Sequence, residues 1–240
     1  MQKITNEVGF DSSPKGRLGG TNSVIIVAGG SGSRMHSKVP KQFLEIAGKP
    51  ILMHTIEKFH AADSAIKIIA VLPEDEIAAW KSLCAKFHFN ATHEIERGGV
   101  TRFHSVKNGL EKITGPGIVG IHDGVRPLTS LELIRKCFAA AEEKGNAVPC
   151  VPMRESMRLI EGERNTVADR NGFVSIQTPQ CFSVEVLKRA YNAEYNSSFT
   201  DDATVVETIG EKINLVEGEY ANIKITFPVD LVMAEAFLKS

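Results

Sequence analysis

The sequence contains few cysteines and no long hydrophobic run, and both absences narrow the class of protein. Its four cysteines are not within metal-ligand spacing of one another and lie in apolar contexts, which favours buried, reduced thiols in a cytosolic protein. The seven histidines form no His-x-x-x-His pair, so no structural zinc site is predicted. No run of roughly 18 apolar residues occurs, so no transmembrane span is expected.

Charge of one sign is not in excess either. The 28 Lys and Arg residues nearly balance the 29 Asp and Glu residues, and the formal net charge is −1. A general nucleic-acid or membrane surface is therefore not predicted, and an anionic ligand would have to be held by cations gathered locally. The 240 residues, 42% hydrophobic and 24% charged, fit one soluble globular domain with or without an excursion.

Residues 1–22 differ from the rest of the chain. They are rich in Gly, also contain Ser and Lys, and lack a sustained apolar run, which excludes a secretory signal. We expect a flexible leader, either native or added for expression, followed by one domain over residues 23–240.

A glycine-rich loop follows the first apolar run. Residues 24–27 are β-branched and suit a strand buried on both faces, and the next residues are Ala28-Gly29-Gly30-Ser31-Gly32-Ser33-Arg34. Glycines let a polyanion approach the backbone, and Arg34 and Lys41 add positive charge. Pro40 stiffens the segment that carries Lys41. These features predict a loop for a nucleotide polyphosphate; the alternative is an ordinary turn with a solvated Arg and Lys.

Two better-known phosphate loops do not fit this stretch. The P-loop pattern Gly-x-x-x-x-Gly-Lys-Ser/Thr is absent. The dinucleotide fingerprint fails as well, because Met35 stands where its third glycine should be.

Apolar patterning predicts alternating strands and helices, and hence a Rossmann-like α/β fold. Such alternation gives a mainly parallel twisted sheet with helices on both faces. The polar breaks at 29–34, 98–102 and 123–126 each follow a strand, so they should meet at the carboxyl edge of the sheet. Strands are expected at 24–27, 66–72, 92–95, 117–121, 212–217 and 222–226, and helices at 51–62, 74–87, 101–113, 131–144, 184–191, from 200 and at 228–238.

The pattern changes over residues 153–176. Short β-like pieces around 157–161 and 165–168 surround Glu161-Gly162-Glu163, which indicates a projecting two-stranded arm. Such a hairpin is unstable alone in water, so we expect it to pack on a second subunit of a homodimer.

Two further clusters could carry chemistry, each beside a structural alternative. Gly99, Arg102 and Ser105 surround a helix start that could bind an anion or read a base edge, or simply present a solvated Arg. Asp123 could contact a ribose or Mg²⁺ with Arg126 as a phosphate clamp, or the two could form a structural ion pair.

The remaining features favour transfer chemistry without a protein nucleophile. His122 is expected to pack rather than to catalyse, and Asp169-Arg170-Asn171-Gly172 is a turn sequence. Lys224 lies between two apolar residues and would face solvent from a strand if it binds no ligand. No Gly-x-Ser-x-Gly elbow, Cys–His pair or His-Glu-x-x-His motif occurs. Cations at strand ends suit phosphoryl or nucleotidyl transfer, in which charge neutralisation does most of the work.

At these residues the chain resembles the sugar-phosphate nucleotidyltransferases, and within them the 2-C-methyl-D-erythritol 4-phosphate cytidylyltransferase family. The resemblance covers about residues 23–240, and only the leader lies outside it. The motifs that carry it, in chain order, are Ala28-Gly29-Gly30-Ser31-Gly32-Ser33-Arg34-Met35, Pro40-Lys41-Gln42, Gly99-x-x-Arg102-x-x-Ser105, His122-Asp123-x-x-Arg126-Pro127, Asp169-Arg170-x-Gly172, Thr178-Pro179-Gln180, Thr200-Asp201 and Asn222-Ile223-Lys224.

The resemblance implies a cytoplasmic enzyme that transfers CMP from CTP to the polyol phosphate, with Mg²⁺ bound mainly through the CTP phosphates. The implied catalytic residues are Arg34, Lys41 and Lys224, and the implied CTP-binding residues are Ala28, Gly29, Gly30, Ser31, Gly32, Gly99, Arg102, Ser105 and Asp123, the last a possible metal ligand. The implied substrate-binding residues are Arg126, Ser156, Arg170, Thr178 and Thr200, with Arg170 reaching the partner's site across a homodimer.

Departures from the family pattern are small. Ser156 stands where a threonine is frequent and keeps the hydroxyl, and Val100 stands where some members have Asp. Two other functions remain open from the sequence. One is a ribitol 5-phosphate cytidylyltransferase, which shares most motifs, and the other is a nonenzymatic nucleotide-binding module.

Overall fold

The computed structural model describes residues 20–30, 35, 37 and 39–239. Four residues of the predicted phosphate loop, Ser31, Gly32, Ser33 and Arg34, lie outside the described residues, as does most of the expected leader. Within the described part, no helix is both long enough and apolar enough to cross a membrane.

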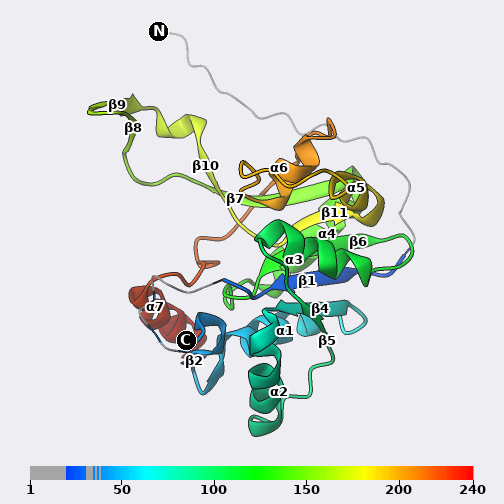
Figure 1. The fold of residues 1–240 in the computed structure, drawn as a ribbon. Coiled ribbons are helices and arrows are strands. Elements are labelled where there is room, and N and C mark those ends of the chain that lie inside the picture. Colours follow the sequence, from blue (N-terminus) through cyan, green and yellow to red (C-terminus); the bar gives the residue numbers. More distant parts are fainter. Residues whose placement is uncertain (1–19, 31–34, 36, 38, 240) are drawn as a thin grey trace.

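The body of the protein is a mixed sheet with helices on both faces (Figure 1). At its centre lies β1 (Ser23–Val27), which pairs in parallel with β4 (Lys67–Leu72) on one side and β6 (Ile118–Asp123) on the other. Beyond β4, the strand β5 (Glu94–Arg97) is also parallel. The carboxyl ends of these strands therefore share one edge, which confirms the predicted mainly parallel α/β architecture.

The other half of the sheet contains reversed strands. β11 (Gln180–Ser183) is antiparallel to both β6 and β7 (Asn146–Pro152). β10 (Val174–Ile176) is antiparallel to β7, whereas β12 (Leu215–Glu217) is parallel to it. The sequence did not indicate β7, because it follows Gly145 directly, without a separating loop.

Alternation along the central strands builds two hydrophobic cores. Val24 and Ile26 of β1 face one core, and Ile25 faces the other. The first core is covered by α1 (Ile51–Ala62), α2 (Ile77–Lys86) and α4 (Leu131–Lys144), and the second by α3 (Arg102–Glu111), α5 (Val184–Ala190) and α6 (Asp202–Glu207). A strand buried on both faces has to be apolar throughout, as residues 24–27 are.

Local signals place several helix ends where the sequence predicts them. Ser130 Oγ accepts a hydrogen bond from Leu133 N (2.9 Å) at the start of α4, and Gly145, with φ of 87°, ends it. The predicted helix over 74–87 begins instead as a 3-10 turn, Glu74–Glu76, before α2.

Two strand predictions need correction. The strand expected at 92–95 lies two residues later, at β5. Residues 222–226 do not form a strand, and Ile225 N bonds Val125 O (2.9 Å), in the turn after β6, instead of joining a ladder. Lys224 therefore stands on an irregular segment.

The arm projects from the body as a separate hairpin (Figure 1). β8 (Met157–Glu161) and β9 (Arg164–Ala168) pair only with each other among the described strands, and a 3-10 turn, Arg170–Gly172, follows. Leu159, Ile160 and Val167 are exposed along the hairpin.

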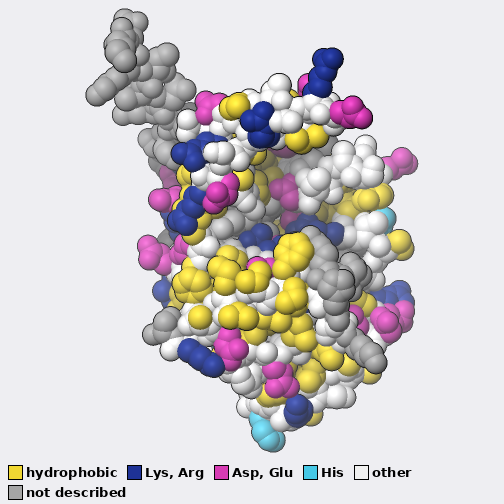
Figure 2. All heavy atoms as spheres, turned by 90° about the vertical axis from the view of Figure 1, so that its left-hand side faces the viewer, with side chains coloured by type: hydrophobic (Ala, Val, Ile, Leu, Met, Phe, Trp, Pro, Cys, Tyr) yellow, Lys and Arg dark blue, Asp and Glu magenta, His cyan; other side chains and the backbone are white. Residues whose placement is uncertain are grey.

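The closing helix α7 (Pro228–Lys239) packs through Ala234 beside the short β2 (Glu45–Ile46) and β3 (Lys49–Pro50) strands. Figure 2 shows hydrophobic side chains gathered on the face of the molecule where α7 lies. The large hydrophobic side chains that the helix itself exposes are Val229, Val232, Met233 and Phe237.

Candidate active site

Two adjoining clefts open at the carboxyl edge of the sheet. In Figure 2 this face is hollowed, and charged side chains of both signs lie inside the hollow. The predicted meeting of the three polar breaks is therefore observed for their described residues. The first cleft is lined by residues that include Ala28, Gly29, Gly30, Lys41, Gly99, Arg102, Ser105, Asp123 and Lys224. The second is lined by residues that include Arg126, Thr178, Gln180, Thr200 and Asp201, and it shares Arg102, Asp123 and Lys224 with the first.

Lys41 lies against the glycine loop. A Cβ added to Gly30 would stand 3.4 Å from Lys41 Cε and 3.7 Å from Nζ, so the ammonium group is beside the backbone that follows β1. Lys41 begins a 3-10 turn, Lys41–Phe43, and Phe43 at the end of this turn stacks on Trp80 of α2 with ring centroids 5.9 Å apart. The lysine is thus held on a packed turn, although its stem is long and flexible.

The loop between β5 and α3 is held in place by residues at the start of α3. Gly99 N donates to Ser105 Oγ (3.1 Å), and Ser105 Oγ donates to Thr101 O (3.0 Å). A Cβ on Gly99 would lie 2.3 Å from the Cβ of His104, so only glycine fits there. Gly99 is therefore required by helix packing, and Ser105 holds the loop that forms the cleft wall.

Arg102 forms a partly buried ion pair, so it is not simply a solvated arginine. Its Nη1 and Nη2 donate to Asp202 Oδ1 (2.9 Å) and Oδ2 (2.6 Å). Tyr191 Oη donates to the same Asp202 Oδ1 (2.7 Å). Burial alone would lower the pKa of Arg102, but the adjacent Asp202 carboxylate raises it above the ordinary value. Arg102 is therefore a fixed cation that lines both clefts.

Sequence reasoning missed Asp202 as the anchor of this arginine. The stretch from Thr200 predicts a helix cap, and the cap is in fact Asp201, whose side chain accepts from Thr204 N (2.9 Å). Gln180 was also missed: its Oε1 accepts from Asp202 N (3.0 Å) and Ala203 N (2.9 Å). Two adjacent acids after a threonine give no sign of which one turns inward.

Asp123 is paired with two cations where β6 ends. Arg126 Nε lies 3.0 Å and Lys224 Nζ 3.2 Å from Asp123 Oδ2, and Arg126 Nη1 donates to Asn222 O (2.7 Å). Burial would raise the pKa of Asp123, but Lys224, Arg126 and Arg102 together hold it below the usual range. The predicted Asp–Arg pair exists, and Lys224 joins it.

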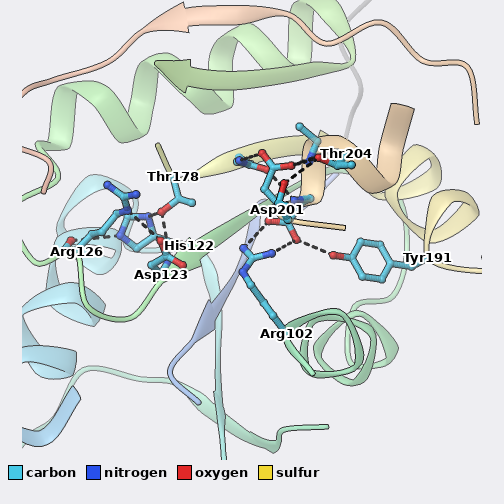
Figure 3. Close-up of polar contacts among 12 residues, drawn as sticks. Arg102, His122, Asp123, Arg126, Thr178, Tyr191, Asp201 and Thr204 are labelled. Carbon is cyan, nitrogen blue, oxygen red and sulfur yellow. Dashed lines mark hydrogen bonds and ion pairs between the residues drawn. The ribbon is translucent and has the colours of Figure 1, made fainter. Parts of the chain in front are cut away.

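His122 belongs to a buried chain of hydrogen bonds with a consistent direction (Figure 3). Asp123 N donates to Thr178 Oγ1 (3.1 Å), Thr178 Oγ1 lies 3.0 Å from His122 Nδ1, and His122 Nε2 lies 3.3 Å from Arg126 O. A neutral imidazole satisfies this order, with the Thr178 hydroxyl donating to Nδ1 and Nε2–H donating to the carbonyl. The ring also packs edge-on against Phe59, which confirms the predicted packing role.

The pKa of His122 gives a testable pH dependence of stability. Burial lowers this pKa from 6.5 to about 3, so between these values the unfolded chain binds a proton that the folded chain does not. This histidine therefore reduces the free energy of unfolding as pH falls below 6.5, by up to about 1.4 kcal/mol per pH unit. Urea unfolding of the wild type and of His122→Asn at pH 7 and 5 should show a shallower pH dependence in the variant; equal slopes would contradict it.

The predicted substrate-binding residues fall into two groups. Thr178 and Thr200 line the second cleft, and Thr200 Oγ1 lies 3.4 Å from Thr204 Oγ1. Ser156 and Arg170 lie on the arm, are exposed and line neither cleft of their own chain. Arg170 Nη1 donates to the backbone oxygen of Arg154.

Comparisons with known proteins agree over almost the whole chain. The family described as IspD: 2-C-methyl-D-erythritol 4-phosphate cytidylyltransferase matches residues 23–240. Curated relatives of that name from Phocaeicola vulgatus and Bacteroides thetaiotaomicron are each 50% identical, over 90% of this chain and 98% and 99% of their own lengths. The crystal structure of the Thermus thermophilus cytidylyltransferase is 31% identical, with a TM-score of 0.75 over 92% of this chain and 100% of that chain. A synthase structure from Anaerococcus prevotii is 28% identical, with a TM-score of 0.77 over 92% and 99%.

Proposed function

This chain belongs to the 2-C-methyl-D-erythritol 4-phosphate cytidylyltransferase family, and we propose that its two clefts divide the family's reaction between the nucleotide and the polyol phosphate. The chain transfers CMP from CTP to 2-C-methyl-D-erythritol 4-phosphate. The products are 4-diphosphocytidyl-2-C-methyl-D-erythritol and pyrophosphate, and the reaction serves the synthesis of isoprenoid precursors.

The first cleft suits CTP. Glycines 29 and 30 leave the backbone open beside Lys41, and the Gly99 loop supplies a wall for the base. In the transfer, a phosphate oxygen of the polyol phosphate attacks the α-phosphorus and pyrophosphate leaves on the opposite side. Lys41 would neutralise the charge that develops there, together with Arg34, which lies outside the described residues.

The second cleft suits the polyol phosphate, and one observation carries the assignment. Arg102, Asp123 and Lys224 line both clefts, so they stand where the two substrates must meet. Lys224 and Arg126 supply positive charge for an incoming phosphate, whereas Thr178 and Thr200 place hydroxyl-bearing side chains along the same cleft. Asp123 keeps the two cations close together before substrate arrives.

Magnesium would be held mainly by the CTP phosphates. Asp123 is the carboxylate that lines both clefts, and it is engaged by two cations. Among the described residues, no group of three or more His, Cys, Asp or Glu side chains could hold a metal ion. When bound, Mg²⁺ supplies charge neutralisation on the phosphates, with Asp123 as its candidate protein ligand.

We further propose a cytoplasmic homodimer in which the arm reaches the partner's site. Exposed apolar side chains on the hairpin and the exposed position of Arg170 support this arrangement. Mixing inactive Lys41→Ala and Arg170→Ala subunits should then restore activity, because one site of each heterodimer combines an intact Lys41 with an intact Arg170. The measurement is pyrophosphate release by heterodimers purified through two affinity tags.

Each variant alone, carrying the same tags, is the control for that experiment. In random mixtures about half of the dimers are heterodimers, and each has one complete site. Inactive heterodimers, verified as such by mass spectrometry, would contradict the crossed arm.

A direct assay tests the substrate. Protein, CTP and Mg²⁺ are mixed with methylerythritol phosphate or with ribitol 5-phosphate, and pyrophosphate is measured. Release with the former is the expected result. Release only with ribitol 5-phosphate would reject the assignment, and nucleotide binding without release from either would indicate a binding module.

A further inference from the structure

Residues 218–224, which we call the linking segment, run from the end of β12 to Lys224. The segment begins in close contact with β7, where Gly218 N donates a hydrogen bond to Cys150 O (2.8 Å). A Cβ on Gly218 would stand 2.4 Å from Gln177 Oε1 and 3.1 Å from Cys150 O, so a larger residue here would displace the Gln177 side chain. From here the segment contacts residues at both ends of the arm and leads to Lys224 in the clefts.

The outgoing side of the arm is attached to Tyr220 of the linking segment. Tyr220 Oη donates to Pro152 O (2.9 Å), at the end of β7. The guanidinium carbon of Arg154 lies 3.3 Å from the centre of the Tyr220 ring, a cation–π contact. We call these two contacts the Tyr220 latch. Tyr220 is 42% exposed, so the latch is not part of a hydrophobic core.

The returning side of the arm is attached to the same segment. Gln177, just after β10, donates from Nε2 to Glu219 O (2.7 Å), and its Oε1 accepts from Glu219 N (3.1 Å). Asn222 Nδ2 donates to Thr178 O (2.9 Å). Both ends of the arm therefore fix the backbone that leads to Lys224.

The far end of the linking segment enters the active site. Arg126 Nη1 donates to Asn222 O (2.7 Å), and Lys224 Nζ lies 3.2 Å from Asp123 Oδ2. The Lys224 side chain is 42% exposed, so its position depends on this backbone more than on its own packing. A shift of the linking segment would move the ammonium group relative to the substrates.

Arg154 also touches the arm's own functional residue. Its backbone oxygen accepts from Arg170 Nη1, while its guanidinium lies on Tyr220. Arg154 thus stands between Arg170, assigned to the partner's polyol phosphate, and the segment that carries Lys224.

We propose that Arg154 and Tyr220 are positioning residues that couple the placement of the arm to the placement of Lys224. The inference rests on the proposed function, because it takes Lys224 and Arg170 as the cations for the polyol phosphate. In a homodimer with crossed arms, the latch makes the geometry of one polyol-phosphate site depend on the arm that serves the other. Of the groups that the latch reaches, Arg126 lines only the polyol-phosphate cleft, whereas Asp123 and Lys224 line both, so CTP binding should depend on the latch less than use of the polyol phosphate does.

The test is a double-mutant cycle of Arg154→Ala and Tyr220→Ala. Each variant should lower kcat/KM for the polyol phosphate about threefold to tenfold, the range expected for loss of a cation–π contact. CTP affinity, measured by calorimetry without the second substrate, should fall by a smaller factor than kcat/KM in both variants. The double variant should have the same kcat/KM as the less active of the two single variants, because both substitutions remove the same cation–π contact. Losses that multiply would overturn the proposal.

Arg158→Ala is the matched control, because it removes an arginine from the same arm that bonds Asn165 across the hairpin instead of Tyr220. Sedimentation should give the same oligomeric state for all variants. Hydrogen exchange over residues 218–224 provides a readout without substrates: it should be faster in Arg154→Ala and unchanged in Arg158→Ala. If exchange over residues 218–224 is unchanged in Arg154→Ala, the coupling is overturned. If exchange is faster in Arg154→Ala but the wild-type protein shows no transferase activity, the proposed function is rejected and the coupling stands.

Discussion

Replacing Lys41 with alanine is expected to lower kcat by about two to three orders of magnitude while the protein stays folded. The ammonium group lies beside Gly30 in the CTP cleft, where charge builds up on the α-phosphorus during transfer. Loss of one preorganised donor at such a centre costs about 10²- to 10³-fold in rate. Single-turnover pyrophosphate release at saturating CTP separates this effect from weaker nucleotide binding.

Two further variants sharpen the Lys41 experiment. Lys41→Arg keeps the charge but replaces a compact ammonium with a planar fork, so it should recover only part of the rate. Lys81→Ala, on the exposed side of α2, should match the wild type. Turnover of Lys41→Ala within tenfold of the wild type would remove Lys41 from the mechanism.

Replacing Asp202 with asparagine is expected to cause the largest loss of stability among single polar changes at the site. Asp202 is fully buried and bonds both Arg102 and Tyr191. The amide cannot neutralise the guanidinium and turns an N–H toward one of its donors, so we expect a loss of about 3 kcal/mol in the free energy of unfolding. Urea unfolding at pH 7 measures it.

The comparison with other variants identifies the source of that loss. Tyr191→Phe removes one bond to the same carboxylate and should cost less than Asp202→Asn, about 1.5 kcal/mol. Arg102→Ala should cost much less in the Asp202→Asn background than in the wild type, because the charge left unpaired is then absent. Equal costs in both backgrounds would show that the ion pair contributes nothing to stability.

The fold follows from features that are local in the sequence. Four β-branched residues at 24–27 predict a doubly buried strand, and Ser130 and Gly145 mark both ends of α4. Such signals need no knowledge of distant partners. The reversed β11 was not foreseeable in this way, because strand direction depends on the path of the chain and not on the composition of four residues.

The candidate site was predictable in part for the same reason. Polar breaks after parallel strands have to meet, so Gly99 and Asp123 could be placed in one cleft before the structure was known. The partner of Arg102 could not, because Asp202 is 100 residues away and an aspartate that caps a helix looks the same in sequence as one that turns inward. The strand predicted around Lys224 is wrong because the alternation of Ile223, Lys224 and Ile225 fits a ladder that does not form.

The pairing of β1 with β6 has a consequence for how the enzyme assembles. Val27 lies opposite Asp123, so the glycine loop and the aspartate meet only after about 100 residues of chain have been brought together. Closing so long a loop costs conformational entropy before any contact is gained, which places this pairing late in folding. The first half of the chain, β1 to β5, would emerge from the ribosome with one side of β1 unpaired. Competence to bind nucleotide therefore requires β6 to pair with β1, and it also waits for Lys224, which lies about 100 residues further along the chain and lines the same cleft.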